Sequence, residues 1–104
     1  MRVVTEEVFG PLLPVYKFKT LDEAIELANK TNYGLSAFVY SGNTDQDIKV
    51  AKSIQAGQVS INGTSYFSDH APFGGYKESG IGRGDGKYGF YESTQAKVIA
   101  RPKR

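Results

Sequence analysis

The sequence predicts an α/β fold in which helices cover a partial layer of parallel sheet. The main support is a repeated pattern, because a capped amphipathic helix followed by a short apolar strand occurs over residues 20–40 and again over residues 44–62. Each helix carries the chain back over the sheet, so successive strands in such units run parallel. The composition agrees, since 39% hydrophobic and 23% charged residues among 104 are typical of one soluble globular domain. An α+β hairpin fold is the alternative.

A short strand is predicted before the first unit, at residues 15–18, which alternate apolar and polar side chains after Pro14. Thr20 then caps a helix, and Glu23 stands three residues later, where it completes a capping box. The predicted buried face of this helix carries Leu21, Ala24, Ile25 and Ala28. The turn Asn32-Tyr33-Gly34 ends the helix.

The second unit follows a mostly apolar run at residues 35–40, which predicts a strand covered on both faces. Thr44 is the predicted cap of the next helix, with Asp47 three residues on. The face of this helix carries Ile48, Ala51 and Ile54. Gly57 is expected to close the helix in the left-handed conformation, before a further strand at residues 58–62.

Residues 63–86 lose this periodicity and contain most of the chain's 12 glycines. An irregular stretch of this length inside a domain is usually functional or held by neighbouring structure. A brief helix is predicted at residues 88–93 and a last strand at residues 96–100. That strand is the natural candidate for an exposed edge that pairs with another chain.

The glycine-rich segment at residues 80–87 does not match a phosphate-binding loop. A Walker loop requires glycine where Ile81 stands and a hydroxyl residue where Tyr88 stands. The dinucleotide-binding pattern requires glycine at Asp85. The spacing therefore excludes both kinds of loop.

Charge and residue usage exclude several other functions. The net charge of +2 is too small and dispersed to indicate a nucleic-acid or membrane partner, and the basic end at residues 101–104 is expected to be a solvated tail. The absence of cysteine excludes disulfides, thiolate metal sites and a cysteine nucleophile. His70 is the single histidine, so no metal site is expected. A cytoplasmic protein is the default expectation.

Two groups of side chains are candidate binding residues. Glu7 and Phe9 stand two apart in an extended segment and project to the same side, where a carboxylate can accept from ribose hydroxyls and an aromatic ring can meet nicotinamide. The pattern alone favours a solvated turn for this pair. Tyr66, Phe67 and Phe73 either pack into a core or line an apolar pocket, and the pattern alone favours the core.

Several segments of the chain carry a family resemblance. The two longest are Glu6-Glu7-Val8-Phe9-Gly10-Pro11 and Pro72-Phe73-Gly74-Gly75-Tyr76-Lys77-Glu78-Ser79-Gly80. The others are Asn32-Tyr33-Gly34-Leu35-Ser36-Ala37, Gly57-Gln58-Val59-Ser60-Ile61-Asn62, Gly80-Ile81-Gly82-Arg83 and Lys97-Val98-Ile99. Together they resemble the C-terminal portion of the NAD(P)-dependent aldehyde dehydrogenases, over essentially the whole chain. Gly84 departs from the family pattern, which usually has an acidic residue there.

The resemblance implies roles for the candidate residues. Glu7 and Phe9 would hold the nicotinamide ribose of NAD or NADP in the full-length enzyme, although tight binding to this chain alone is not expected. Tyr66 and Phe67 would border the aldehyde tunnel, and Phe73 would lie in the family's Pro-Phe-Gly-Gly turn. An aromatic pair at this place favours an apolar or aromatic aldehyde.

The resemblance also implies that the chain lacks catalytic residues of its own. In the family the catalytic cysteine, the general-base glutamate and the nucleotide-binding domain precede the segment at residues 6–11. Residues 1–95 would then form part of a catalytic domain, and residues 96–104 a C-terminal oligomerisation strand and basic tail. The chain is expected to form homo-oligomers through its sheet edges and to be inactive alone. The alternative is a non-enzymatic, self-associating α/β interaction module.

Overall fold

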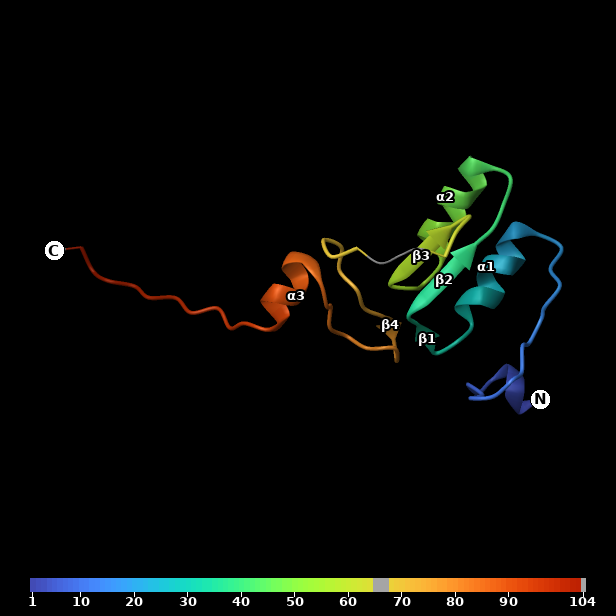
Figure 1. Ribbon diagram of the computed structural model, residues 1–104, viewed down its shortest axis with the longest axis horizontal. Helices are drawn as coiled ribbons and strands as arrows, with labels where there is room; N and C mark the ends of the chain where they lie inside the picture. The colour runs from blue at the N-terminus through green and yellow to red at the C-terminus, as the bar shows by residue number, and fades with distance from the viewer. Residues whose placement is uncertain (65–67, 104) are drawn as a thin grey trace.

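The computed structural model describes residues 1–64 and 68–103 of the chain. Figure 1 shows the first two α-helices and their strands grouped at one end, while the C-terminal segment runs away from them as an extended trace. In chain order the elements are η1 (Arg2–Val4), α1 (Leu21–Asn29), β1 (Tyr33–Gly34), β2 (Ser36–Val39), α2 (Thr44–Ser53), β3 (Gln58–Ile61), β4 (Tyr76–Lys77) and α3 (Gly86–Glu92).

The described strands form two small two-stranded sheets. β2 and β3 pair in parallel, from Ser36 opposite Gln58 to Val39 opposite Ile61, and α2 makes the crossover between them. This confirms the predicted α/β fold and its parallel pairing. β1 and β4 pair antiparallel, and this pair was not predicted, because β4 lies in the stretch that has no hydrophobic periodicity.

The predicted capping box of α1 is confirmed, with one difference. The hydroxyl of Thr20 accepts from the backbone N–H of Glu23 at 3.2 Å. The carboxylate of Glu23 reaches back one residue further than expected, to the N–H of Lys19 at 2.7 Å. These contacts satisfy donors that the start of a helix leaves unpaired.

The predicted ends of α2 are both wrong. Asn43 is the N-cap in place of Thr44, because its side-chain oxygen accepts from the N–H groups of both Asp45 and Gln46. The helix stops at Ser53, where the extended residue Ile54 is the C-cap. Gly57 has no positive φ and closes no helix. A glycine is needed at this position because the backbone of Gly74 lies very close. A Cβ at residue 57 would stand 1.7 Å from the carbonyl oxygen of Gly74.

Two predicted strands do not form in the single chain. Residues 15–18 and residues 96–100 have no strand assignment, and no described backbone pairs with them. An extended segment becomes a strand only when a neighbour satisfies its N–H and C=O groups. The predicted short helix is confirmed as α3, which starts at Gly86.

The strand predicted as covered on both faces is half exposed. Ala37 and Val39 are partly buried, whereas Phe38 is 47% exposed and Tyr40 is 65% exposed. The reason is that, within residues 1–64 and 68–103, no second layer covers this face of β2. The prediction of two covered faces is therefore wrong for the chain by itself.

The described residues do not close a hydrophobic core. Ala56, at 9% exposure, is the one buried hydrophobic side chain among them. The accessible surface is 9121 Å², whereas a compact monomer of 11.4 kDa exposes about 5,800 Å². The radius of gyration is 18.7 Å, against about 13 Å for a compact domain of this length.

A polar clasp holds the fold together where a core does not. The clasp consists of Lys77, whose Nζ donates to the carbonyl oxygens of Asn29 at 2.7 Å and Thr31 at 2.8 Å, and of Ser79, whose Oγ accepts from the N–H of Gly34 at 2.9 Å. An ammonium group at these carbonyls satisfies acceptors left open where α1 ends and interacts favourably with the helix dipole. The clasp therefore fastens β4 to both α1 and β1.

Asn29 joins the ends of the two main helices. Its Nδ2 donates to the carbonyl oxygen of Ser53 at 2.8 Å, and its Oδ1 accepts from the N–H of Gln55 at 2.8 Å. Both atoms of the amide are thus occupied by the backbone at the end of α2. Since Lys77 binds the carbonyl of the same residue, α1, α2 and β4 meet at Asn29.

We expect Gly57→Ala to destabilise the chain by more than about 3 kcal/mol, because the added Cβ must displace the backbone at Gly74. Gly42→Ala is the matched control, since a Cβ at Gly42 meets nothing within 4 Å. Urea unfolding followed by far-ultraviolet circular dichroism measures both. Equal midpoints for the two variants would contradict the close contact.

We expect Lys77→Met to lower the free energy of unfolding by about 1–2 kcal/mol, since two carbonyl oxygens lose a charged donor. Lys30→Met removes a lysine from the same end of α1 and is the control, because that side chain is exposed and makes none of the clasp contacts. Thermal unfolding and the rate of proteolysis at residues 76–79 measure the difference. Identical values for both variants would argue against the clasp.

Candidate functional site

The two neighbouring glutamates near the start of the chain differ in their contacts. Glu6 is engaged in an ion pair with Arg2 at 2.9 Å, four residues away. Glu7 has no side-chain hydrogen bond or ion pair with any described residue. Its carboxylate is therefore available to accept hydrogen bonds from a ligand, whereas the carboxylate of Glu6 is engaged by Arg2.

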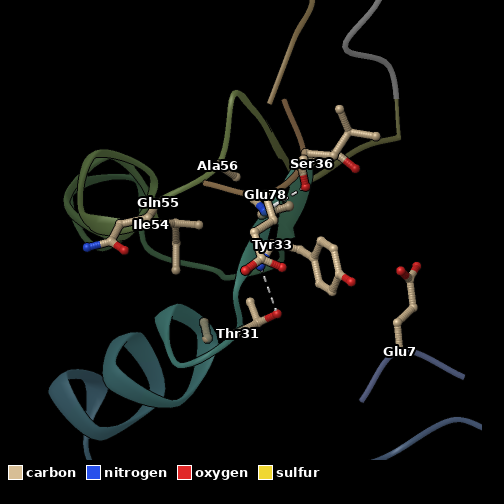
Figure 2. A pocket seen from close by; sticks show the side chains of 13 residues that line it. Glu7, Thr31, Tyr33, Ser36, Ile54, Gln55, Ala56 and Glu78 are labelled. Carbon is tan, nitrogen blue, oxygen red and sulfur yellow. Dashed lines mark hydrogen bonds between the residues drawn. The ribbon is translucent and has the colours of Figure 1, made fainter. Parts of the chain in front are cut away.

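A cavity of about 470 Å³ lies where α1 and α2 end and β2 begins. Glu7, Thr31, Tyr33, Ser36, Gln55 and Glu78 supply its polar wall. In Figure 2 the side chains of Glu78 and Tyr33 lie near the middle of the group, and Glu7 stands across from them on a separate segment. The cavity thus gathers carboxylates and hydroxyls from parts of the chain that are far apart in sequence.

This cavity offers hydrogen-bond acceptors but no paired nucleophile and base. Among the described residues that line it, none is histidine, cysteine or lysine. Ala28, Leu35, Ile54 and Ala56 supply the apolar wall. The arrangement suits the holding of a polar or hydroxylated group better than covalent chemistry.

Of the other predicted site residues, Phe9 and Phe73 do not line this cavity. Phe9 does not line it, and its ring is 96% exposed. Phe73 is partly buried at a bridge in which its N–H donates to the carbonyl of Gly84 at 2.9 Å and its carbonyl accepts from the N–H of Gly84 at 2.7 Å. Tyr66 and Phe67 lie outside the described residues.

The glycine-rich segment at residues 80–87 forms turns that lead into α3. Gly86 has a φ of 55°, and a Cβ there would stand 2.6 Å from the carbonyl oxygen of His70. The N–H of Gly86 donates to the carbonyl of Asp69 at 3.1 Å. The backbone carbonyl of Asp69 thus supports the start of α3, and the close approach of the His70 carbonyl leaves no room for a side chain at Gly86.

The burial of Asp47 was not predicted. The sequence pattern indicates a partner of a helix cap at this position, whereas the side chain is only 2% exposed and its Oδ2 accepts from Nδ2 of Asn62 at 3.2 Å. The signal was present, because Asp47 stands four residues before Ala51 and seven before Ile54, on the predicted inward face of the helix.

The described residues contain neither a metal-binding cluster nor a membrane-spanning helix. Within residues 1–64 and 68–103, no group of three or more histidine, cysteine, aspartate or glutamate side chains is placed to hold a metal ion. No helix in the described part of the chain is long and apolar enough to cross a membrane.

Comparison with known protein sequences shows one consistent group of relatives. The model of the aldehyde dehydrogenase family matches residues 1–99. The chain is 50% identical over 99 residues to an aldehyde dehydrogenase of Enchytraeus buchholzi and 48% identical to aldehyde dehydrogenase 1A1 of Gallus gallus. These matches cover 95% of this chain but only 20% and 19% of the relatives, so the chain spans about a fifth of their length.

Solved structures give the same result. Betaine aldehyde dehydrogenase of Staphylococcus aureus in complex with NAD⁺ matches with a TM-score of 0.83 and 48% identity, over 88% of this chain and 18% of that one. Mycobacterium tuberculosis aldehyde dehydrogenase complexed with NAD⁺ matches with a TM-score of 0.89 and 39% identity, over 98% of this chain and 21% of that one. The resemblance that the motifs carry is thereby confirmed at the level of the family. By its sequence and its fold, the chain belongs to the aldehyde dehydrogenase family.

Proposed function

We propose that this chain is the C-terminal portion of an NAD(P)-dependent aldehyde dehydrogenase and acts only within the longer enzyme, which oxidises an aldehyde to a carboxylic acid. The observation that supports this proposal is the solvent-accessible surface area of the chain. It exposes 9121 Å², about 3,300 Å² more than a compact monomer of its mass. A standard protein interface covers only about 800 Å² on each partner. The excess exposed area of this chain is larger than that, and it agrees with a chain that shares its hydrophobic core with the rest of a domain.

The chemistry of the reaction also supports catalytic residues that lie in another part of the enzyme. Oxidation through a covalent thioester requires a cysteine thiolate and a base that activates water. The chain contains no cysteine, so the nucleophile must come from another part of the enzyme. We assign no catalytic residue to this chain. Residues 1–95 belong to the catalytic domain, and residues 96–104 form the oligomerisation strand and tail.

Glu7 and Phe9 are the proposed cofactor-binding residues. The carboxylate of Glu7 has no partner among the described residues, and the ring of Phe9 is 96% exposed, so both groups are open to a ligand. A free carboxylate fits ribose hydroxyls, and an open aromatic face fits a nicotinamide ring. When bound, NAD or NADP supplies the hydride acceptor of the reaction. In the chain, Glu7 orients the ribose and Phe9 shields one face of the ring.

Tyr66, Phe67 and Phe73 are the proposed contributors to the aldehyde pocket. Phe73 is held by its backbone bridge to Gly84, which gives its side chain a defined starting point. An apolar or aromatic aldehyde fits an aromatic wall of this kind. The proposed compartment is the cytoplasm.

The proposed assembly is a homo-oligomer that uses the sheet edges. Val98 and Ile99 are 91% and 86% exposed, and no described backbone satisfies the groups of residues 96–100. Pairing of this segment with a strand of another subunit would cover the two apolar side chains and satisfy the backbone groups.

We expect the purified 104-residue chain to show no aldehyde oxidation with NAD or NADP, because none of its side chains can form the thioester. Mixing it with the remainder of the enzyme, which carries the cysteine, should restore turnover. Spectrophotometric detection of reduced cofactor measures both. Turnover by the chain alone would favour a different kind of enzyme. Stable binding of two copies of the chain, without restored turnover in the mixture, would favour the interaction module.

In the full-length enzyme we expect Glu7→Gln to lower the rate of hydride transfer about tenfold or more while changing the Kd of the cofactor less, since the change removes orientation of the ribose. Glu6→Gln is the matched control, because Glu6 is occupied by Arg2 on the surface. Single-turnover kinetics and cofactor titration separate the two quantities. An unchanged rate for Glu7→Gln would count against the ribose role.

A further inference from the structure

Asn62 and Gly63 follow β3 and form an asparagine–glycine pair. In such a pair the backbone nitrogen of the glycine can attack the side-chain amide of the asparagine, because glycine has no side chain to hinder the approach. The other asparagines of the chain precede lysine, tyrosine and threonine, whose side chains obstruct this approach: Asn29, Asn32 and Asn43. The sequence therefore singles out Asn62 for this reaction.

The backbone nitrogen of Gly63 is open to react. Within the described part of the chain, no group accepts a hydrogen bond from its N–H. The chemically similar pair Asp85-Gly86 differs, because the N–H of Gly86 donates to the carbonyl of Asp69 at 3.1 Å. A nitrogen in a hydrogen bond has to lose that bond before it can attack. The structure therefore favours reaction at Asn62-Gly63 over reaction at Asp85-Gly86.

The side-chain amide of Asn62 is held at both ends. Its Oδ1 accepts from the N–H of Ser41 at 2.9 Å, and its Nδ2 donates to Oδ2 of Asp47 at 3.2 Å. Attack by the glycine nitrogen makes the amide carbon tetrahedral and expels Nδ2, so the contact between Nδ2 and Asp47 has to open. A reaction that requires a local opening is slowed by every contact that opposes the opening.

Asp47 depends on this same contact. Its side chain is 2% exposed, and its Oδ1 is buried without a hydrogen-bond partner. Nδ2 of Asn62 is therefore the one donor that the described residues give to the carboxylate. A buried carboxylate that loses its donor destabilises the folded state. Loss of Nδ2 from Asn62 thus has a structural consequence at α2.

We propose that Asn62 is a site of spontaneous deamidation, that Asp47 slows the reaction, and that the product loosens the exit from β3, defined here as Asn62 and Gly63. The nitrogen of Gly63 gives its proton to solvent and forms a bond to Cγ of Asn62. The bond between Cγ and Nδ2 breaks, and Nδ2 leaves as ammonia with a proton from water. Water then opens the succinimide ring to aspartate or isoaspartate, so each event consumes one water and releases one ammonia, without oxidation or reduction.

The product changes the exit from β3 in two ways. The new carboxylate only accepts hydrogen bonds, so it cannot donate to Asp47 and repels it. Isoaspartate also inserts a side-chain carbon into the backbone next to Gly63, whose carbonyl accepts from Oγ of Ser60 at 2.9 Å and from the hydroxyl of Tyr40 at 3.3 Å. The inference goes beyond the proposed function and does not depend on it.

The first test incubates the purified 104-residue chain in mildly alkaline buffer and follows each asparagine by peptide mass spectrometry. We expect acid to accumulate at Asn62 and not at the other asparagines. Gly63→Ala is the matched control and should show no conversion in the same period. Alanine fits there, because Gly63 has no positive φ and a Cβ would meet its nearest neighbours, Ile61 and Ser60, at 3.8 Å. Equal conversion in the two proteins overturns the proposed reaction.

The second test measures the same rate in Asp47→Ala and Asp45→Ala. We expect Asp47→Ala to speed deamidation of Asn62 about tenfold, since the opening no longer costs a hydrogen bond to a charged group. Asp45→Ala should change nothing, because Asp45 is an exposed acid in the same first turn of α2. Equal rates in Asp47→Ala and the unaltered chain, or no conversion at Asn62 in either, overturn the proposal.

Isoaspartate formation at Asp85 is the internal control of the second test. It stays unchanged if the effect of Asp47→Ala is local, and it rises if the whole chain unfolds and releases the N–H of Gly86. In the second case the comparison of the unaltered chain with Gly63→Ala still decides whether Asn62 is the site.

The third test examines the product without waiting for the reaction. Asn62→Asp should lower the urea midpoint of unfolding, because Asp47 loses its donor and faces a second carboxylate. Adding Asp47→Asn to Asn62→Asp should recover most of the loss, since the exchanged pair again places an amide against a carboxylate. Equal midpoints for Asn62→Asp and the unaltered chain overturn the proposed loosening.

Discussion

The meeting of α1, α2 and β4 at Asn29 is the interaction on which the rest of the structure depends. Both atoms of the Asn29 amide bind backbone at the end of α2, and Lys77 donates to the Asn29 carbonyl from a point 48 residues away in the chain. Helix ends leave carbonyl groups that must find donors, and here the donors come from other elements. Two helices and a distant turn are therefore held in register by backbone satisfaction, with little contribution from apolar packing.

Backbone contacts as close as those at Gly57 explain why so many glycines follow the second helical unit. A side chain at Gly57 would collide with the carbonyl of Gly74, and one at Gly75 would stand 2.5 Å from Ser79. The segment that looks like a flexible, glycine-rich loop in sequence is thus a set of tightly apposed turns. This accounts for the family motif at residues 72–80 in physical terms, since its lysine and serine fasten the turn and its glycines let the backbones approach.

The incomplete core and the proposed function have one cause. Phe38 on β2 is 47% exposed and Tyr40 just after it is 65% exposed, and the extended residues 15–18 have no neighbouring strand among the described residues. A layer that is covered on one face requires more protein to cover the other. Under the proposed function, the remainder of a longer aldehyde dehydrogenase would supply that protein, together with the thiolate that the chain lacks.

The sequence by itself determined the family and the start of α1, whereas the predicted ends of α2 and the strands predicted at residues 15–18 and 96–100 were wrong. Thr20 and Glu23 start α1 through contacts within about one turn of helix. The strands β2 and β3 could be predicted because their sequence patterns involve only neighbouring residues. The tertiary structure alone decided which distant groups meet. The burial of Asp47 against Asn62 and the clasp at Lys77 join residues that local periodicity cannot relate, because a hydrogen bond between separated segments depends on how the helices and strands are placed in space.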